Sequence, residues 1–466
     1  MTDLPVRFPR DPYCRAGTRL MLTRSDETGA CFLGLTPDGV QPGRDMLARL
    51  SLWRGETPLD YTAAQESGAV LLRAEGGFVR LSLGLPERLV IEGEGVSLLI
   101  GKGRAVGMFM SGGSAVDDAL PGALYVNAGA RMRIVPKTGS VEVRSAWNLN
   151  ALSDPDPRVF LHPDESGALN ASIYVTDFDA PPEETAAPAA EVDFERFLAA
   201  LTARPTDGEA LHAAYIVWSC LQPARRLAAP QIAGPVYVSN RRTCGTAKLS
   251  DNVLLAALLA DPSAAARQMC AFLPYADESG LLPREVNNRS RLYEAETPYF
   301  GAVLRARPEI LGALGEADYR ALARALGWWR RERFCPDRGK FFYLHRYEPG
   351  FGGRYPFPAD APDCSPALNA LMRMWLEAMA ALAERFGAPA EAAAYRAQAL
   401  PLPETLGAGE LFPEALELPV LLAGDAAAKQ IACERARRGD REVTSLRRAL
   451  TVLAADLAER GRAHAD

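Results

Sequence analysis

The pattern of hydrophobic residues changes once along this chain, between residues 179 and 191. Before that point, short runs such as GAVLLRAEGGFVRLSLG (68–84) alternate apolar with polar residues and are separated by glycine-containing turns. Alternation with a period of two is typical of strands that bury one face. After that point, apolar residues recur every three or four positions, which is the period of a helix. The sequence therefore predicts a multidomain α+β chain.

The boundaries follow from the same change of pattern. Residues 1–180 are expected to form an N-terminal antiparallel β-sandwich. Residues 181–194 are expected to be a linker, because the surrounding run DAPPEETAAPAAE (179–191) is rich in Pro, Ala and Glu and has little to bury. Residues 195–466 are expected to form a helical domain.

Composition excludes several classes of partner. The net charge of −6 gives no basic surplus for nucleic acid, and no apolar run is long enough to span a bilayer. The first residues lack the apolar core of a secretory signal, and the eight cysteines are scattered without a C-x-x-C pair. We therefore expect a cytoplasmic protein with free thiols. The four histidines are not at metal-ligand spacing, so we expect no metal.

One glycine-rich run raises the question of a nucleotide. Gly101, Lys102 and Gly103 lie close together, but they lack the G-x-G-x-x-G spacing and the helix that follows a phosphate-binding loop. A hairpin is the better interpretation, and we expect no cofactor.

The segment from Phe341 to Gly387 is the most informative for function. Its second half predicts a helix, with Ser365 as the N-cap, Pro366 at the first helical position and Gly387 after the end. Its first half places tyrosines and phenylalanines among arginines and acids. Such a loop suits a sugar, which offers an apolar C–H face and a rim of hydroxyls. An ordinary surface loop whose aromatic residues anchor it to the core is the alternative.

Long connections separate the expected helices. The ranges 223–249, 276–296 and 336–364 stand where a simple helical bundle would use short turns. Long ordered loops often carry function. Their alternation with helices is what one rim of an α/α toroid would show.

These segments carry a resemblance to a known family. The runs AAYIVWSCLQP, LSDNVLLAALLADP, FLPYADESGLLPREVNN and ETPYFGAVL, followed by the 341–387 segment, resemble the catalytic domain of glycoside hydrolase family 63 and its trehalase-like relatives. The order and spacing hold across about 180 residues. The resemblance implies an (α/α)6 barrel, inverting glycosidase chemistry and a preceding β domain.

Position by position, the resemblance implies altered chemistry. The family's general acid falls at Gly352, which has no proton to donate, whereas Glu348 keeps the first acidic position of the motif. Phe351 and Tyr355 could desolvate the Glu348 side chain, which would let Glu348 act as the acid. Glu348 is therefore the predicted catalytic residue. Ser250 replaces a tryptophan that stacks on sugar in the family, while Asp251 retains the hydroxyl-binding carboxylate. The family's base is a glutamate near the C-terminus, and the candidates here are Glu410, Glu414 and Glu417.

The remaining candidates are substrate-binding residues. Each also has a structural interpretation: Glu296, for example, precedes an expected helix, where any carboxylate is favourable. Acids in DESG (277–280) are better read as turn residues. The predicted substrate-binding set is Asp251, Glu296, Arg284, Asn288, Phe351, Tyr355 and Asp363.

The predicted function is inverting hydrolysis of a small α-linked glucoside or related oligosaccharide. Inversion requires two carboxyl groups about 6.5–9.5 Å apart, with one of them carrying a proton. Two alternatives stay open: a catalytically impaired carbohydrate-binding protein on a glycosidase scaffold, and a lyase or epimerase on the same toroid. The only partner that we expect is the small sugar, and the sequence does not assign an oligomeric state.

Overall fold

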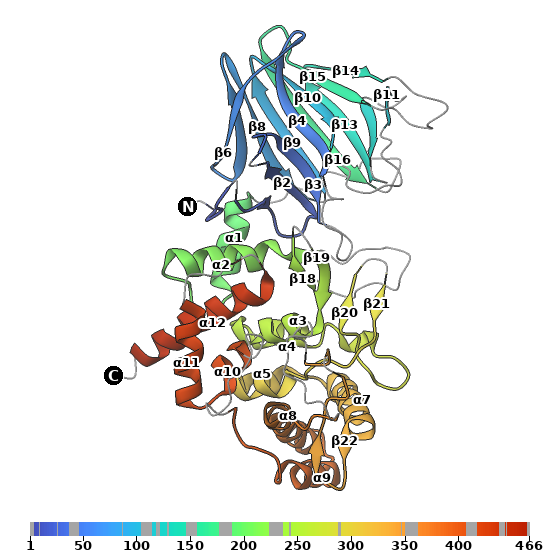
Figure 1. The fold of residues 1–466 in the computed structure, drawn as a ribbon, viewed down its shortest axis with the longest axis vertical. Helices are drawn as coiled ribbons and strands as arrows, with labels where there is room; N and C mark the ends of the chain where they lie inside the picture. The colour runs from blue at the N-terminus through green and yellow to red at the C-terminus, as the bar shows by residue number, and fades with distance from the viewer. Residues whose placement is uncertain are drawn as a thin grey trace. The chain divides into compact units, whose positions relative to one another are not determined.

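Antiparallel sheets occupy the N-terminal part of the chain and helices the C-terminal part (Figure 1). The computed structural model describes residues 4–8, 10–25, 27–36, 46–85, 87–103, 114–117, 122–127, 130–145, 156–176, 189–222, 236–241, 244–287, 290–345, 347–349, 362–406, 417–437, 443 and 445–463. Two compact units result. The β unit comprises Met1–Arg196, Trp218–Gln222 and Asn240–Gly245, and the helical unit comprises the rest.

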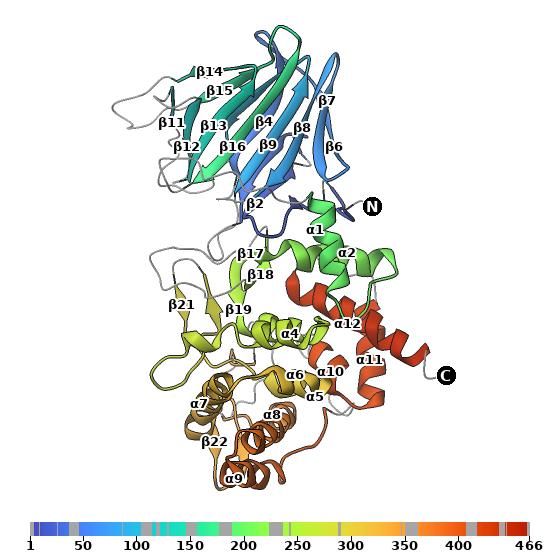
Figure 2. The same cartoon turned by 180° about the vertical axis from the view of Figure 1, so that it is seen from behind.

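The β unit contains two antiparallel sheets that lie one behind the other in both views (Figures 1 and 2). In the first sheet the strands have the order β1-β2-β3-β4-β10-β15-β14, and β5 pairs with β4. Its strands are β1 Tyr13–Cys14, β2 Leu20–Arg24, β3 Cys31–Leu35, β4 Met46–Arg54, β5 Thr57–Pro58, β10 Ser97–Lys102, β14 Ser140–Arg144 and β15 Arg158–His162.

The second sheet has the order β11-β12-β13-β16-β9-β8-β7-β6. Most of its neighbouring strands are also consecutive in sequence, as in hairpins. Its strands are β6 Tyr61–Glu66, β7 Ala69–Ala74, β8 Gly77–Gly84, β9 Arg88–Glu94, β11 Ser114–Asp117, β12 Ala123–Asn127, β13 Ala130–Thr138 and β16 Ala168–Thr176.

Alternation along the strands explains how this unit buries its core. On β8, Val79, Leu81 and Leu83 are buried while their neighbours are partly exposed. On β4, Leu50 and Leu52 are fully buried. The expectation of antiparallel sheets in the N-terminal part is confirmed.

The helices follow, and the first of them overlaps the expected linker. Helix α1 begins at Ala190, and its Phe194 is fully buried against Trp218, with ring centroids 5.5 Å apart. The predicted linker 181–194 is therefore wrong in its last residues, because Phe194 and Leu198 give this segment an apolar face to bury. Residues 181–188 lie outside the described residues.

The helical unit takes its name from the elements that dominate it. Besides α1 Ala190–Ala199, the helices of the chain are α2 Gly208–Ser219, α3 Leu249–Leu255, α4 Pro262–Met269, α5 Phe300–Ala306, α6 Glu309–Ala313, α7 Glu316–Glu332, α8 Pro366–Arg385, α9 Pro389–Ala399, α10 Glu417–Ala423, α11 Ala426–Arg437 and α12 Leu446–Ala463. Single 3-10 turns follow α3 at Ala256–Leu258 and α4 at Leu273–Tyr275.

Helix starts were predictable because their caps are local. Helix α8 begins at Pro366, and the Ser365 hydroxyl accepts a hydrogen bond from the amide of Leu368. It ends before Gly387, whose φ of +74° is the left-handed conformation that glycine adopts readily. Helix α4 begins at Pro262, with Asp261 accepting from two backbone amides. The predicted start of α8 and its end before Gly387 are confirmed.

Short strands interrupt the helices, and the expectation of an all-helical second half is wrong there. One sheet has the order β17-β18-β19-β20-β21, and β22 pairs with β23. Most of these strands have two residues, too few to show an alternating pattern. They are β17 Leu221–Gln222, β18 Val236–Asn240, β19 Cys244–Lys248, β20 Glu285–Val286, β21 Arg291–Leu292, β22 Phe334–Cys335 and β23 Lys340–Phe341.

Two buried asparagines tie these strands to helices. Asn252 of α3 accepts from the amide of Tyr237 (2.9 Å) and donates to its carbonyl (3.0 Å). Asn369 of α8 makes the same pair of bonds with Phe341, at 2.8 and 2.9 Å. Each asparagine side chain thus satisfies both the amide and the carbonyl of one strand residue. These bonds hold that strand against the helix that carries the asparagine.

Candidate functional site

Asp251 is held at the start of α3 by an arginine from far along the chain. Arg447 of α12 donates from Nε to Asp251 Oδ1 at 2.6 Å, and Ser239 donates to Oδ2 at 3.4 Å. The Asp251 side chain is only 4% exposed. Burial, the largest single effect, lowers the pKa of Arg447, but the charge and hydrogen bond of Asp251 and the nearby Tyr299 and Glu296 together outweigh it, so that pKa is raised. The pair is therefore a buried ion pair.

Glu296 lies beside this pair, in the segment that leads to α5. Its Oε2 accepts a hydrogen bond from the amide of Ser250 at 3.2 Å, so Glu296 caps the beginning of α3. Burial raises the pKa of Glu296, and the Asp251 charge raises it further. The Ser250 bond and the cations of Arg284 and Arg447 oppose this without cancelling it. The raised pKa of Glu296 favours the protonated form of this carboxyl.

A small cavity adjoins the buried Glu296. Its volume is about 20 Å³, room for one water molecule and far too little for a sugar ring. Besides Glu296, its walls include Trp328, Trp329 and Trp375. An apolar wall of this kind removes bulk water from the carboxyl, which favours the uncharged form.

A tyrosine completes the cluster. The guanidinium carbon of Arg447 lies 5.4 Å from the centre of the Tyr299 ring. Burial raises the pKa of Tyr299, which is 3% exposed. Arg447 therefore contacts both Asp251 and Tyr299. We name Asp251, Glu296, Tyr299 and Arg447 the acid cluster.

Two contacts join the acid cluster to the segment that contains Glu348. Thr297, next to Glu296, hydrogen-bonds the Tyr343 hydroxyl at 2.9 Å and donates to the Pro349 carbonyl at 3.3 Å. Arg284 donates to the Tyr347 carbonyl at 3.3 Å and to Glu294 at 2.9 Å. The sequence-predicted residues Asp251, Glu296 and Arg284 are thus near one another, and the 343–349 segment adjoins them.

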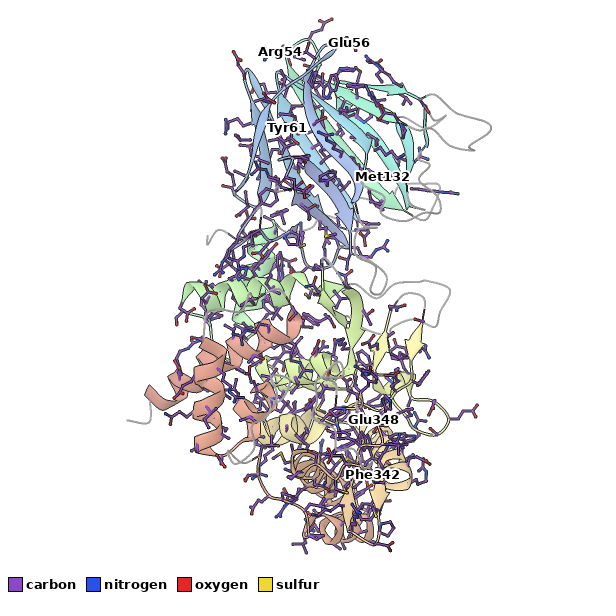
Figure 3. The ribbon with its side chains drawn as sticks, viewed as in Figure 1. Arg54, Glu56, Tyr61, Met132, Phe342 and Glu348 are labelled. Atoms are coloured by element: carbon purple, nitrogen blue, oxygen red, sulfur yellow. The ribbon has the colours of Figure 1, made fainter. Side chains whose placement is uncertain are left out.

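Glu348 itself, labelled in Figure 3, is engaged in a different set of contacts. Arg333 donates to its Oε1 from Nη2 at 2.7 Å and from Nε at 3.1 Å. The amide of Leu344 donates to Oε2 at 2.7 Å. Both carboxylate oxygens therefore accept bonds from the protein, and Glu348 ties its turn to the end of α7. Its predicted catalytic role stays a prediction.

The other predicted site residues divide into two groups. Asp363 pairs with Tyr343 through two backbone hydrogen bonds, of 2.8 and 2.9 Å, so these two residues lie side by side. Asn288, Phe351, Tyr355 and the altered acid position Gly352 lie outside the described residues.

The C-terminal carboxylates offer one described candidate. Glu417 on α10 is buried, with Oε2 3.7 Å from Arg448 Nη1. This pair packs α10 on α12, adjacent to the Asp251 partner Arg447. Glu410 and Glu414 lie outside the described residues.

Sequence reasoning missed Arg333 and Arg447, and only a general signal pointed to them. A buried carboxylate requires a cation or several donors, so Asp251 and Glu348 each implied a partner. That requirement gives the residue type. It does not give the position, since Arg447 is 196 residues from Asp251.

Among the residues that the structure describes, no group of three or more His, Cys, Asp or Glu side chains is placed to bind a metal ion. Within those residues, no helix has both the length and the apolar character to cross a bilayer.

No family model and no curated protein sequence matches this chain. Solved structures do. A bacterial glucoamylase in complex with acarbose superposes with a TM-score of 0.50 at 8% identity, covering 84% of this chain and 66% of the glucoamylase. An inverting mannosidase of glycoside hydrolase family 92 from Bacteroides thetaiotaomicron also gives a TM-score of 0.50, at 13% identity, covering 83% of this chain and 61% of the mannosidase. The chain spans just under two thirds of each. At these identities the likeness is one of fold alone.

Proposed function

We propose that the chain is a glycoside hydrolase that acts with inversion on a small α-linked glucoside or a related oligosaccharide. Its scaffold would be an α/α toroid preceded by a β-sandwich, as in the family 63 resemblance. The observation that carries the proposal is Glu296, a buried carboxyl whose raised pKa suits a proton donor, next to the ion-paired Asp251. The fold of the two similar hydrolases supports it.

Roles follow from the contacts. Glu296 would protonate the glycosidic oxygen, in place of the family acid that is lost at Gly352. Because the cavity beside Glu296 has room for one water molecule only, this role requires the cavity to open when the sugar binds. Asp251, oriented by Arg447, would accept hydrogen bonds from sugar hydroxyls, because an ionised carboxylate has several acceptor positions. Glu348 would hold the 343–349 segment through Arg333 rather than donate a proton.

A second function also has a specific observation in its favour. Asp251 and Glu348, two of the carboxylates in this region, are engaged by arginines. An inverting enzyme also needs a free carboxylate to activate water. A carbohydrate-binding protein that has lost turnover would not need one.

Sugar release distinguishes the two functions. The full chain would be incubated with α-glucosides, including trehalose, and the anomer of the released sugar would be followed by NMR, with binding measured by calorimetry. We expect release of the β-anomer, which is the product of inversion from an α-linkage. Binding without release would select the carbohydrate-binding function.

Three variants assign the proton donor. We expect Glu296→Gln to lower turnover by about 10²–10⁴-fold, the usual contribution of a general acid. Glu348→Gln tests the prediction from sequence that Glu348 is the acid. Glu316→Gln is the matched control, because Glu316 is an exposed glutamate at the start of α7 that pairs only with Arg320 in the contacts described. Loss in Glu348→Gln with retention in Glu296→Gln would return the acid role to Glu348.

A further inference from the structure

The β unit carries a pocket that is unrelated to the acid cluster. Its volume is about 490 Å³, within the range of about 300–1,000 Å³ that ligand pockets occupy. Its lining comes from strands β4 and β10 of the first sheet, with contributions from the β2–β3 turn, from Pro58 to Tyr61 and from the start of β15. Tyr61, at the start of β6, is labelled in Figure 3.

The sequence places this lining on one face of the sheet. Leu50 and Leu52 of β4 are fully buried, so Arg49, Ser51 and Trp53 project to the opposite side. Antiparallel register then places Leu99 opposite Ser51 and Gly101 opposite Arg49. Because residue 101 is glycine, no side chain fills the space next to Arg49.

Two aromatic residues in the wall are held rigidly. The Trp53 indole donates to Ser51 Oγ at 3.1 Å, and its ring meets Phe160 edge to face at 5.5 Å. The Tyr61 hydroxyl donates to the Leu50 carbonyl at 2.8 Å and accepts from the Cys31 amide at 2.9 Å. Both side chains remain partly exposed. Partly exposed rings with fixed orientation are suited to stacking on the C–H face of a sugar.

Charged groups surround the aromatic pair. The lining contains three cations, Arg49, Lys102 and Arg158, and two carboxylates, Asp60 and Asp156. Arg158 and Asp156 form an ion pair, with Nε and Oδ2 2.8 Å apart. Cations therefore exceed carboxylates by one here, in a chain whose net charge is −6. Asp60 can accept hydrogen bonds from hydroxyl groups, and Arg49 can pair with a carboxylate.

We propose that this pocket binds a saccharide that carries a carboxylate, such as a uronic acid unit. Trp53 and Tyr61 contact the sugar ring, Asp60 accepts from its hydroxyls, and Arg49 and Lys102 attract its charge. The proposal stands on the β unit alone and does not depend on hydrolysis by the helical unit.

Calorimetry with the full chain tests it, using a glucuronate-containing disaccharide and the corresponding neutral disaccharide as probes. We expect the acidic probe to bind at least tenfold more tightly at low salt, and the difference to shrink as salt is added. Absence of binding, or equal binding of both probes, would overturn the proposal.

A glycine substitution blocks the pocket with little risk to the fold. A Cβ at residue 101 would lie 3.9 Å from its nearest neighbours, an ordinary contact, so Gly101→Leu should fold and should abolish binding. Gly84→Leu is the control, because Gly84 ends β8 in the other sheet and a Cβ there also makes ordinary contacts, the nearest at 3.5 Å. Unchanged binding by folded Gly101→Leu would contradict the assignment.

A charge variant tests the ligand class separately. Arg49→Gln removes an exposed cation and should weaken the acidic probe about tenfold while leaving the neutral probe unchanged. Arg73→Gln, which removes an exposed cation outside the pocket, should change neither. Any sugar release by the chain from a neutral α-glucoside should persist in Gly101→Leu, so failure here is distinguishable from failure of the proposed hydrolysis.

Discussion

At Glu296, burial and hydrogen bonding act in opposite directions on one carboxyl group. Removal from water favours the protonated form, whereas the Ser250 amide and two nearby arginines favour the charged form. Burial is the larger effect, so the pKa is raised. Asp251, in the same cluster, is paired directly with Arg447 at 2.6 Å. Neighbouring carboxyls in different environments can thus take different roles.

The raised pKa of Glu296 predicts a pH dependence of stability. The unfolded chain releases this proton near the ordinary glutamate pKa of about 4.3, whereas the folded chain retains it to higher pH. The free energy of unfolding should therefore fall as pH rises from about 4.3 through the folded pKa. Urea unfolding of the wild type and Glu296→Gln across this range measures the effect. The variant should lose less stability over the interval, and identical slopes would contradict the shift.

The buried pair of Asp251 and Arg447 predicts a coupled loss of stability. Arg447→Met leaves the Asp251 carboxylate buried without its cation, which should cost about 3–5 kcal/mol of unfolding free energy. Adding Asp251→Asn should recover part of that loss, because burying an unpaired neutral amide costs less free energy than burying an unpaired carboxylate. Denaturant unfolding of both single variants and the double variant gives the coupling energy. Strict additivity would show that the two groups do not interact.

At the scale of elements, the site depends on close packing between helices α5 and α8. The Phe300 and Trp375 rings lie 5.1 Å apart, next to a glycine in α5 that allows the two backbones to approach. A Cβ on Gly301 would lie 2.2 Å from the Trp375 amide nitrogen. Glu296 precedes α5, and Trp375 lines the same cavity as Glu296, so this contact also positions the candidate proton donor.

Gly301→Ala should therefore destabilise the chain despite the better helix propensity of alanine. Separating two packed helices is expected to cost about 1–3 kcal/mol or more, measured by denaturant unfolding. Gly327→Ala in α7 is the matched control. A Cβ there meets only the flexible end of Arg331, at 3.2 Å, so this variant should be neutral or stabilised by up to about 1 kcal/mol. A neutral Gly301→Ala would contradict the packing described.

Elements with local signals could be predicted from the sequence, whereas elements made by distant pairing could not. The start of α8 is marked by two adjacent residues, Ser365 and Pro366, and the strand alternation before residue 180 is visible over short windows. The two-residue strands β20 to β23 exist because backbone partners meet in three dimensions. For the same reason the predicted linker overlaps α1. Phe194 of α1 packs against Trp218, twenty-four residues later in the sequence, and a local pattern does not reveal that contact.

At the scale of the whole molecule, the order of β unit and helical unit was predictable, and the composition of the site was predictable in part. The resemblance to glycosidases selected Asp251, Glu296 and Arg284, which the structure brings together. Glu348 keeps the first acidic position of the family motif, and it was predicted to act as the acid because the acid position itself is Gly352. Position in a motif does not specify where a side chain points. Here that side chain meets Arg333, a contact created by the end of α7.

The proposed hydrolysis depends most on Glu296, which would donate the proton when a glycosidic bond breaks. The most direct test compares two substrates for the wild type and Glu296→Gln: an α-glucoside with a poor alcohol leaving group, and α-glucosyl fluoride, whose leaving group departs without protonation. We expect Glu296→Gln to lower kcat/KM for the first substrate by about 10²–10⁴-fold and to change it little for the second. Equal loss for both substrates, or no loss for either, would contradict this role of Glu296.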